Sequence, residues 1–367
     1  FIVIKRIIKL LIMYFIANHK KALWVGINIF MVASMVIIGG ITRLTNSGLS
    51  MTEWSLIGGI MPPLNEQSWN ILLEKYKVTP EFQFKNYDMT LNQFKKIFFW
   101  EYLHRIWGRI IGITFFVPLI FLWINKQFSF TEKRYFALLT LIGCFQGFMG
   151  WFMVESGLVD KPDVSHFRLS AHLTTAFLIY ILLFFCFWNY LGRQSPFERS
   201  VTNQKIKKHS KRIIISIILL IITISSGAFV SGTNAGWAYN NFPLMGDNFF
   251  PPVIIEGTNL SMANLFNDIG FIQFFHRVLA TLTLITIFIT VYKGARDVNL
   301  TKLKSYFYFL GIFVICQYTL GVIILKLYVP VALGLFHQLG SLIVLTNLII
   351  IFAEIKNRGT RMRPSVQ

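Results

Sequence analysis

The feature that most constrains this chain is a series of long apolar stretches, each about as long as the roughly 20 helical residues that cross a bilayer. Hydrophobic residues make up 54% of the chain and charged residues 14%, with a mean hydropathy of +0.58. Inside lipid only helices and closed barrels satisfy the backbone, and these stretches lack the alternation of barrel strands. We therefore predict an all-α integral membrane protein with eight transmembrane helices, at about residues 22–42, 104–124, 135–154, 169–191, 213–231, 271–292, 306–326 and 331–353.

The basic residues are distributed as in a multi-pass membrane protein. A formal charge of +19 is also compatible with nucleic-acid binding, so their placement decides between the two. Of 35 Lys and Arg, 23 fall in the termini and alternate loops, against 9 in the other loops, and residues 234–270 contain none. Because cytoplasmic loops are enriched in Lys and Arg, we expect both termini to be cytoplasmic and no nucleic-acid partner.

An internal repeat relates the two halves of the chain. The segment GGITRLTNSGLS, which begins at Gly39, resembles GAFVSGTNAGWA, which begins at Gly227, at an offset of 188 residues. Four helices separate equivalent positions, so both halves enter the membrane from the same side and form two parallel-repeat four-helix bundles. The expected parts are a cytoplasmic segment (1–21), the first bundle (22–192), a basic cytoplasmic linker (193–212), the second bundle (213–354) and a cytoplasmic tail (355–367).

The outer loops of the two halves differ in length. Asn46 and Asn234 follow the first helix of each half, and such residues favour tight left-handed turns. The first bundle has a long outer loop (43–97), and its polar and aromatic part from residue 64 predicts one or two short helices on the outer face. The second half has a shorter counterpart at residues 253–270.

Four histidines are expected at one depth, near the outer surface, because they lie at equivalent positions of helices that all run from outside to inside. They are His104, His172, His276 and His337. Ionisable side chains within membrane helices are functional candidates. Two pairs in two bundles are hard to explain as structural residues, and facing neutral imidazoles suit axial coordination of a haem iron. The sequence therefore predicts two haem sites, one in each half.

Other histidines and the cysteines are weaker candidates. His166 lies in an outer loop, whereas His19 and His209 lie in basic runs and are expected to be solvated. The three cysteines fall inside apolar stretches, where a thiol usually packs as a small core residue; they are Cys144, Cys186 and Cys316. No disulfide framework is predicted.

Polar residues near the histidines carry further expectations. Arg105 and Arg277 directly follow two of them, and each is a candidate either for anchoring a helix end or for pairing with haem propionates. Glu101 lies one helical turn before His104, where the second half has Gln273. A di-iron site would need several further inward carboxylates, which are absent. The glutamines of the third helices, Gln146 and Gln317, are expected to form interhelical hydrogen bonds.

The motifs together resemble one family. GGITRLTNSGLSMTEW, EYLHRIWGR, FRLSAHL, FFHR and GLFHQLGS look, in their order and spacing, like haem A synthase, in the version with a long first outer loop found in mitochondria and related bacteria. The resemblance extends over about residues 24–353. It implies oxidation of the C8 methyl group of haem O to a formyl group, giving haem A for cytochrome oxidase, with haem B as cofactor. It also implies an inner (cell) membrane location.

The resemblance assigns roles to the candidate residues. His104, His172, His276 and His337 match the family's haem ligands, and Glu101 matches its acidic residue on the second helix. We expect the iron of haem B between His276 and His337, with Arg277 and Arg105 as further cofactor-binding residues. Because only Glu101 can take up protons, we expect the substrate haem iron between His104 and His172, with Glu101, His104 and His172 as the catalytic residues.

Some expectations stay open at this point. Membrane lipid is an expected partner, haem O synthase and an unidentified electron acceptor are further candidates, and homo-oligomerisation is compatible with the sequence. Some family members carry a cysteine pair between the fifth and sixth helices, and residues 234–270 contain none. Oxygen activation and direct electron withdrawal are both compatible with the motifs. A di-haem cytochrome that relays electrons is the alternative function; a transporter would favour helices interrupted at the midplane.

Overall fold

The computed structural model describes residues 2–53, 59–158, 163–192, 204–257 and 261–361, and these contain helices but no β-strand. Eight helices are long and apolar enough to cross a membrane. Each contains one of the apolar stretches, so the predicted fold class is confirmed. They are α1 (Ile2–Leu44), α4 (Leu91–Ile124), α5 (Phe130–Leu158), α6 (His166–Gly192), α7 (Gln204–Gly232), α10 (Ile269–Ala295), α11 (Lys304–Lys326) and α12 (Val331–Arg361).

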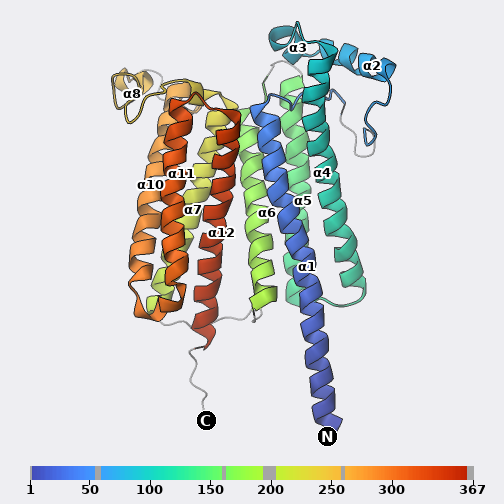
Figure 1. Cartoon of the computed structure of the whole chain (residues 1–367), viewed down its shortest axis with the longest axis vertical. Coiled ribbons are helices and arrows are strands. Elements are labelled where there is room, and N and C mark those ends of the chain that lie inside the picture. The colour runs from blue at the N-terminus through green and yellow to red at the C-terminus, as the bar shows by residue number, and fades with distance from the viewer. Residues whose placement is uncertain (1, 54–58, 159–162, 193–203, 258–260, 362–367) are drawn as a thin grey trace.

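The long helices pack mainly with others of their own half (Figure 1). In the first half α1 packs against α4 and α6, and α5 packs against α6. In the second half α7 packs against α10 and α12, and α11 packs against α12, which are the equivalent pairs. The halves meet where α6 contacts α7 and where α12 contacts α1 and α6.

One helix pair breaks this correspondence. In the second half α10 packs along α11, whereas the equivalent helices α4 and α5, both described throughout, pack against each other weakly at most. Apolar side chains are exposed on the membrane-facing sides of both helix pairs, for example Ile113 on α4 and Ile285 on α10. The first half is therefore less tightly packed between its second and third membrane helices than the second half is.

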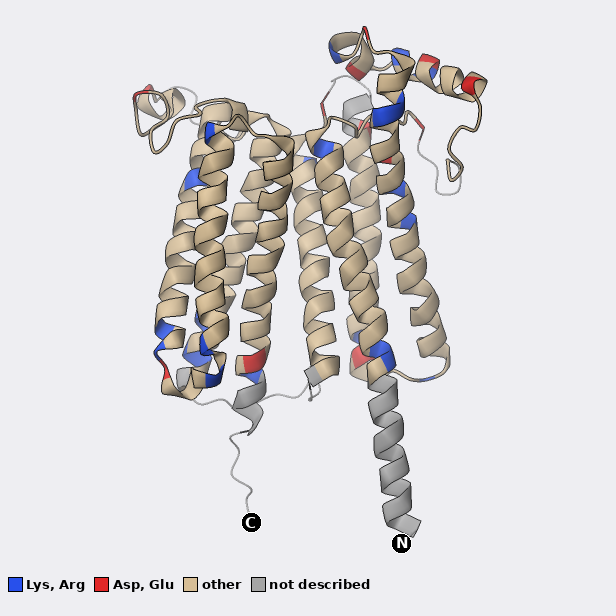
Figure 2. Cartoon of the chain, viewed as in Figure 1, with Lys and Arg blue, Asp and Glu red and all other residues tan. Residues whose placement is uncertain are grey.

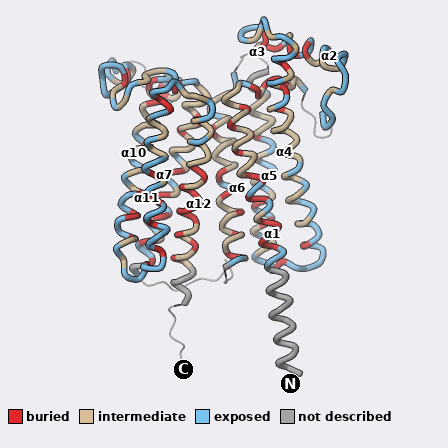
Figure 3. Tube along the Cα trace, viewed as in Figure 1, coloured by how far each residue is buried: buried red, intermediate tan, exposed pale blue. Residues whose placement is uncertain are grey.

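Apolar side chains fill the interior and also cover the membrane-facing surface. One core cluster runs through both halves and includes Phe136, Phe177, Leu310 and Leu345, each fully buried. Figure 3 shows the buried segments on the inward faces of the helices and exposed segments around the outside. Figure 2 shows that charged residues gather at the two ends of the helices, as expected for a protein with an apolar belt.

A small subdomain stands on the outer face of the first half, as predicted for residues 64–97. It consists of α2 (Glu66–Lys77), α3 (Pro80–Lys85) and the first turns of α4. Each of these helices begins at a side-chain cap, provided by Asn65, Thr79 and Thr90. A separate aromatic core of Tyr76, Phe82, Phe94 and Phe98 holds it together. The second half has the short helices α8 (Pro252–Ile255) and α9 (Met262–Leu265), together with η1 (Ala235–Trp237); η2 (Val298–Leu303) precedes α11.

Candidate functional site

The four predicted histidines form two pairs in the structure. His104 on α4 lies close enough to His172 on α6 to interact with it electrostatically, and His276 on α10 has the same relation to His337 on α12. All four lie in the outer parts of helices that run in the same direction. The structure thus places one pair of imidazoles in each half.

Each imidazole packs against a glycine on a neighbouring helix. The glycines leave room for the rings, because a Cβ added at any of the four would come closer to the ring than nine in ten real Cβ contacts do. The distances from such a Cβ are 3.3 Å from Gly39 to Nε2 of His104, 3.2 Å from Gly150 to Cε1 of His172, 3.2 Å from Gly227 to Cε1 of His276 and 3.0 Å from Gly321 to Cε1 of His337.

The donor set fits axial coordination of a haem iron. The Nδ1 atoms of His172 and His337 are buried and have no hydrogen-bond partner among the described residues. A buried ring nitrogen without a partner costs free energy, which a bound group would recover. Neutral imidazole is a common haem ligand, so each pair would hold an iron from two sides.

The glutamines form the interhelical contacts that were expected, but in two different ways. The side-chain amide of Gln146 lies 3.4 Å from Nε2 of His172, so it reaches the ring itself. Gln317 instead donates through Nε2 to the backbone carbonyl of His337, at 2.7 Å. The two halves therefore hold their fourth-helix histidines differently.

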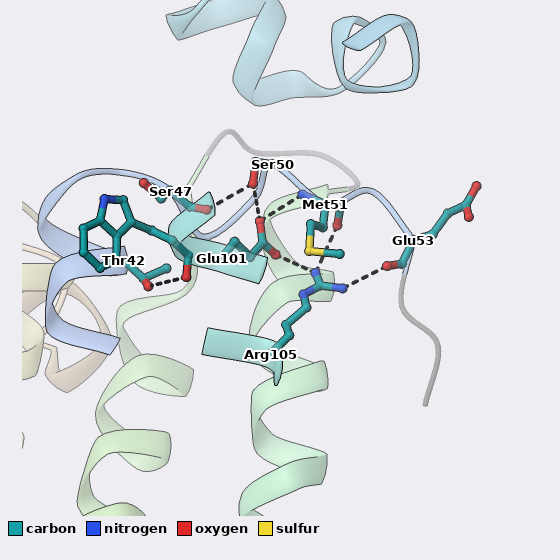
Figure 4. A network of polar contacts seen from close by, with 8 residues as sticks. Thr42, Ser47, Ser50, Met51, Glu53, Glu101 and Arg105 are labelled. Atoms are coloured by element: carbon teal, nitrogen blue, oxygen red, sulfur yellow. Dashed lines mark hydrogen bonds and ion pairs between the residues drawn. The ribbon is translucent and has the colours of Figure 1, made fainter. Parts of the chain in front are cut away.

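Glu101 lies at the centre of a polar network beneath the first outer loop (Figure 4). Its side chain is buried, with 2% of the residue exposed, and it accepts hydrogen bonds from Ser50 Oγ at 2.7 Å and the Met51 backbone N–H at 2.9 Å. Arg105 completes the network through an ion pair of 2.5 Å with Glu101. The guanidinium of Arg105 also donates to the backbone carbonyls of Met51 and Glu53. The pair thus fixes the loop that leaves α1.

Gln273 and Arg277 form the corresponding network in the second half. Gln273 donates to the backbone carbonyls of Ala235 and Ala238, at 2.8 and 2.5 Å. Its amide oxygen accepts from Arg277 at 2.8 Å. Arg277 also donates to several carbonyls of the loop after α7, including that of Tyr239 at 2.7 Å. Both arginines therefore contact their own outer loops in this structure, and pairing with haem propionates stays a prediction.

Sequence reasoning overlooked Arg43 at the end of α1. Asn46 and Asn234 adopt the predicted left-handed conformation, with φ of 50° and 55°. Arg43 joins these two turns, because it donates to the side-chain oxygens of both asparagines, at 3.2 and 3.3 Å, and to the backbone carbonyl of Ser231. One feature of the sequence could have revealed its role: Arg43 is the only basic residue in the two repeated segments, 39–50 and 227–238.

The other histidines and the cysteines make different contacts from those of the two histidine pairs. His166 contacts the backbone carbonyl of Phe266 at 3.0 Å and so joins the two halves. The expectation that His209 is solvated was wrong: α7 already begins at Gln204, and His209 is 6% exposed and lies 2.8 Å from Asp297. The three cysteines are free. Cys186 is buried, as expected for a packing residue, but Cys144 and Cys316 are exposed on apolar helices, so the expectation of core packing was wrong for these two.

Comparison with known proteins finds relatives over nearly the whole chain. Residues 22–349 match the sequence model of the cytochrome oxidase assembly protein family COX15-CtaA. The chain is 42% identical to the heme A synthase of Flavobacterium psychrophilum over 333 residues, covering 90% of this chain and 96% of that protein. It is 39% identical to the heme A synthase of Rickettsia prowazekii over 337 residues, covering 91% of this chain and 97% of that protein. The chain therefore belongs to the heme A synthase family of cytochrome oxidase assembly proteins.

Proposed function

We propose that this protein is a haem A synthase, an oxidoreductase that converts the C8 methyl group of haem O to a formyl group. The observation that carries the proposal is the presence of two facing pairs of imidazoles, each ring set against a glycine, in a chain of this family. One pair would hold a resident cofactor and the other the substrate. Haem B, as the cofactor, supplies one-electron redox chemistry.

The second half is the better candidate for the permanent haem B, held by His276 and His337. Here α10 packs along α11 and α11 packs against α12, so the helices that carry the histidine pair are bridged by a third helix. A cofactor that stays bound through many turnovers favours such a bridged site. Gln273 beside it can form hydrogen bonds but cannot exchange protons at neutral pH.

The first half is the better candidate for the haem O site, bracketed by His104 and His172. The weak packing between α4 and α5 would let these helices separate to admit a substrate with a farnesyl tail from the bilayer. Buried side-chain atoms without a hydrogen-bond partner also gather on α5 and α6; among the described residues they are Thr140 Oγ1, Gln146 Oε1, His172 Nδ1 and Thr174 Oγ1. A bound molecule would satisfy or cover such atoms.

Glu101 is proposed to accept protons released during oxidation. Each two-electron step at the methyl carbon, first to the alcohol and then to the aldehyde, also releases protons. Glu101 lies one helical turn from His104, and its carboxylate is linked to the outer loop through Ser50 and Arg105. The contacts of Glu101 also hold its outer loop in place, as those of Gln273 do. A substitution of Glu101 therefore affects both proton transfer and the loop, and the two effects must be measured separately.

The proposal extends to location and partners. We propose an inner-membrane protein with both termini cytoplasmic, which receives haem O from haem O synthase and passes electrons to a separate acceptor. Residues 234–270 contain no cysteine, so a thiol pair in that loop does not serve as the acceptor here.

The test is pigment analysis of the purified full-length protein. We expect the wild-type protein to contain haem B together with haem O or haem A, whereas haem B alone would indicate an electron relay. His276→Ala and His337→Ala should lose haem B. Glu101→Gln should retain haem B and accumulate haem O or its alcohol. If Glu101→Gln loses haem B while His276→Ala retains it, the roles of the two halves are reversed.

A further inference from the structure

A serine on α7 contacts one ring nitrogen of His276. Ser226 Oγ lies 2.8 Å from His276 Nδ1 and donates its own hydrogen to the backbone carbonyl of Thr223, at 2.7 Å. A hydroxyl has only one hydrogen, so toward the ring Ser226 acts as an acceptor. The Thr223 backbone carbonyl is a second hydrogen-bond partner of His276, and a carbonyl can only accept. The two groups together favour a proton on Nδ1, which leaves the lone pair on Nε2.

The same contact sets the orientation of the ring. A Cβ at Gly227 would lie 3.2 Å from Cε1 of His276 but 3.8 Å from Nδ1 and 3.9 Å from Nε2. The ring of His276 thus presents Cε1 to Gly227 on α7. Its Nδ1 atom contacts Ser226, and its Nε2 atom lies on the side of Cε1 opposite Nδ1. Ser226 is itself buried, with 5% of the residue exposed.

The first half lacks this arrangement. The repeat offset of 188 residues places Ile38 where the second half has Ser226. The structure describes no hydrogen bond to the His104 ring, and the Cβ position of Gly39 meets Nε2 of His104, at 3.3 Å, rather than Cε1. His104 therefore turns its Nε2 edge toward Gly39, whereas His276 turns its Cε1 edge toward Gly227.

We propose that Ser226 is a positioning residue that holds His276 as an iron ligand through Nε2. This rests on the proposed placement of haem B between His276 and His337. A hydrogen bond accepted from Nδ1–H fixes the tautomer and raises the basicity of the opposite nitrogen, and loss of such partners typically costs about 10–100-fold in metal affinity. The serine thus favours a permanently bound haem in one half only.

The experiment compares three variants of the purified full-length protein. Ser226→Ala removes the hydroxyl acceptor and leaves the Thr223 carbonyl in place, whereas Ser226→Thr keeps a hydroxyl. Ser225→Ala is the matched control, because the neighbouring Ser225 bonds to Ser170 Oγ at 2.7 Å instead of to a histidine. The readouts are haem B per polypeptide after dilution, and the midpoint potential of the haem that is retained.

We expect Ser226→Ala to weaken haem B retention by about tenfold or more and to raise the midpoint potential, because a less basic imidazole stabilises the ferric state less. Each tenfold change in the ratio of ferric to ferrous affinity corresponds to about 59 mV. Ser226→Thr and Ser225→Ala should resemble the wild type.

If Ser226→Ala matches Ser225→Ala in both readouts, the inference about Ser226 is wrong. His276→Ala separates this failure from that of the proposed function. Retention of haem B by His276→Ala would show that the haem is not held there, whereas its loss, together with an unchanged Ser226→Ala protein, would overturn only the role of Ser226.

Discussion

Glu81 is a buried carboxyl group in the outer subdomain, outside the membrane-spanning helices. It is 4% exposed, and its Oε2 accepts a hydrogen bond from the hydroxyl of Tyr76 at 2.9 Å. Burial is the main cause that raises the pKa of Glu81 to about 7, and the nearby charges of Glu101 and Asp163 act in the same direction. The hydrogen bond from Tyr76 and the charge of Lys85 oppose this shift only in part.

This raised pKa predicts a pH-dependent stability for the outer subdomain. Between the unfolded pKa of 4.5 and the folded pKa of about 7, the folded state keeps a proton that the unfolded state has lost. Stability should therefore fall as pH rises through this window and level off above it, by roughly 3 kcal/mol at most. Hydrogen exchange of α2 and α3 at pH 5 and pH 7.5 measures the effect.

Glu81→Gln should abolish most of this pH dependence, because an amide does not titrate. Glu74→Gln is the control, since Glu74 pairs with Lys77 on the exposed face of α2. Equal pH slopes in the wild type and in Glu81→Gln would show that another group titrates in this window.

At the same residue scale, the sequence located the histidines but not the groups that hold them. The four histidines were found because the repeat placed them at equivalent positions, and their pairing follows from helix direction alone. Ser226 gave no signal, because a serine near a helix end is common and its contact with α10 depends on packing. The network around Glu101 was also unpredictable, because it depends on the path of the loop through Ser50 and Met51.

At the scale of the helix, the glycines that face the histidines explain how the rings fit between closely packed helices. In the sequence Gly150 and Gly321 each follow the third-helix glutamine of their half by four residues, and small residues let membrane helices approach closely. The structure specifies what they pack against, which is the ring of His172 and that of His337. The closer packing of α10 with α11 than of α4 with α5 had no signal in the sequence, since both pairs are apolar.

Gly321→Ala therefore should disturb the haem B site. Its new methyl group would lie 3.0 Å from Cε1 of His337, closer than nine in ten real Cβ contacts, so the ring must give way by a few tenths of an ångström. We expect loss of most haem B, measured by absorbance of the purified protein per polypeptide. Gly147→Ala is the control, because nothing lies within 4 Å of its added Cβ. In the Gly147 variant a gain of about 0.5–1 kcal/mol in helix stability is the only expected effect. Haem content that is equal in the two variants would contradict the prediction.

At the scale of the whole molecule, the structure places the outer loops and the first turns of α4, α6, α10 and α12 at one end of the helices (Figure 1). The number and direction of the membrane helices were predictable, because lipid imposes a strong constraint on length and apolarity. The extension of α4 into the outer subdomain was not predictable. Its polar residues do not show whether the chain continues as a helix outside the membrane.

The distribution of Lys and Arg predicts which end is cytoplasmic. With 23 of these residues in the termini and alternate loops and 9 in the other loops, the end opposite the outer subdomain should face the cytoplasm. Reporter fusions after residue 200, in the basic linker, and after residue 250, in the loop between α7 and α10, should report opposite compartments, with residue 200 inside. The four histidines then lie near the outer surface. If the fusion after residue 250 reports the cytoplasm instead, both haem sites face the inner surface, and Glu101 would release protons to the cytoplasmic side.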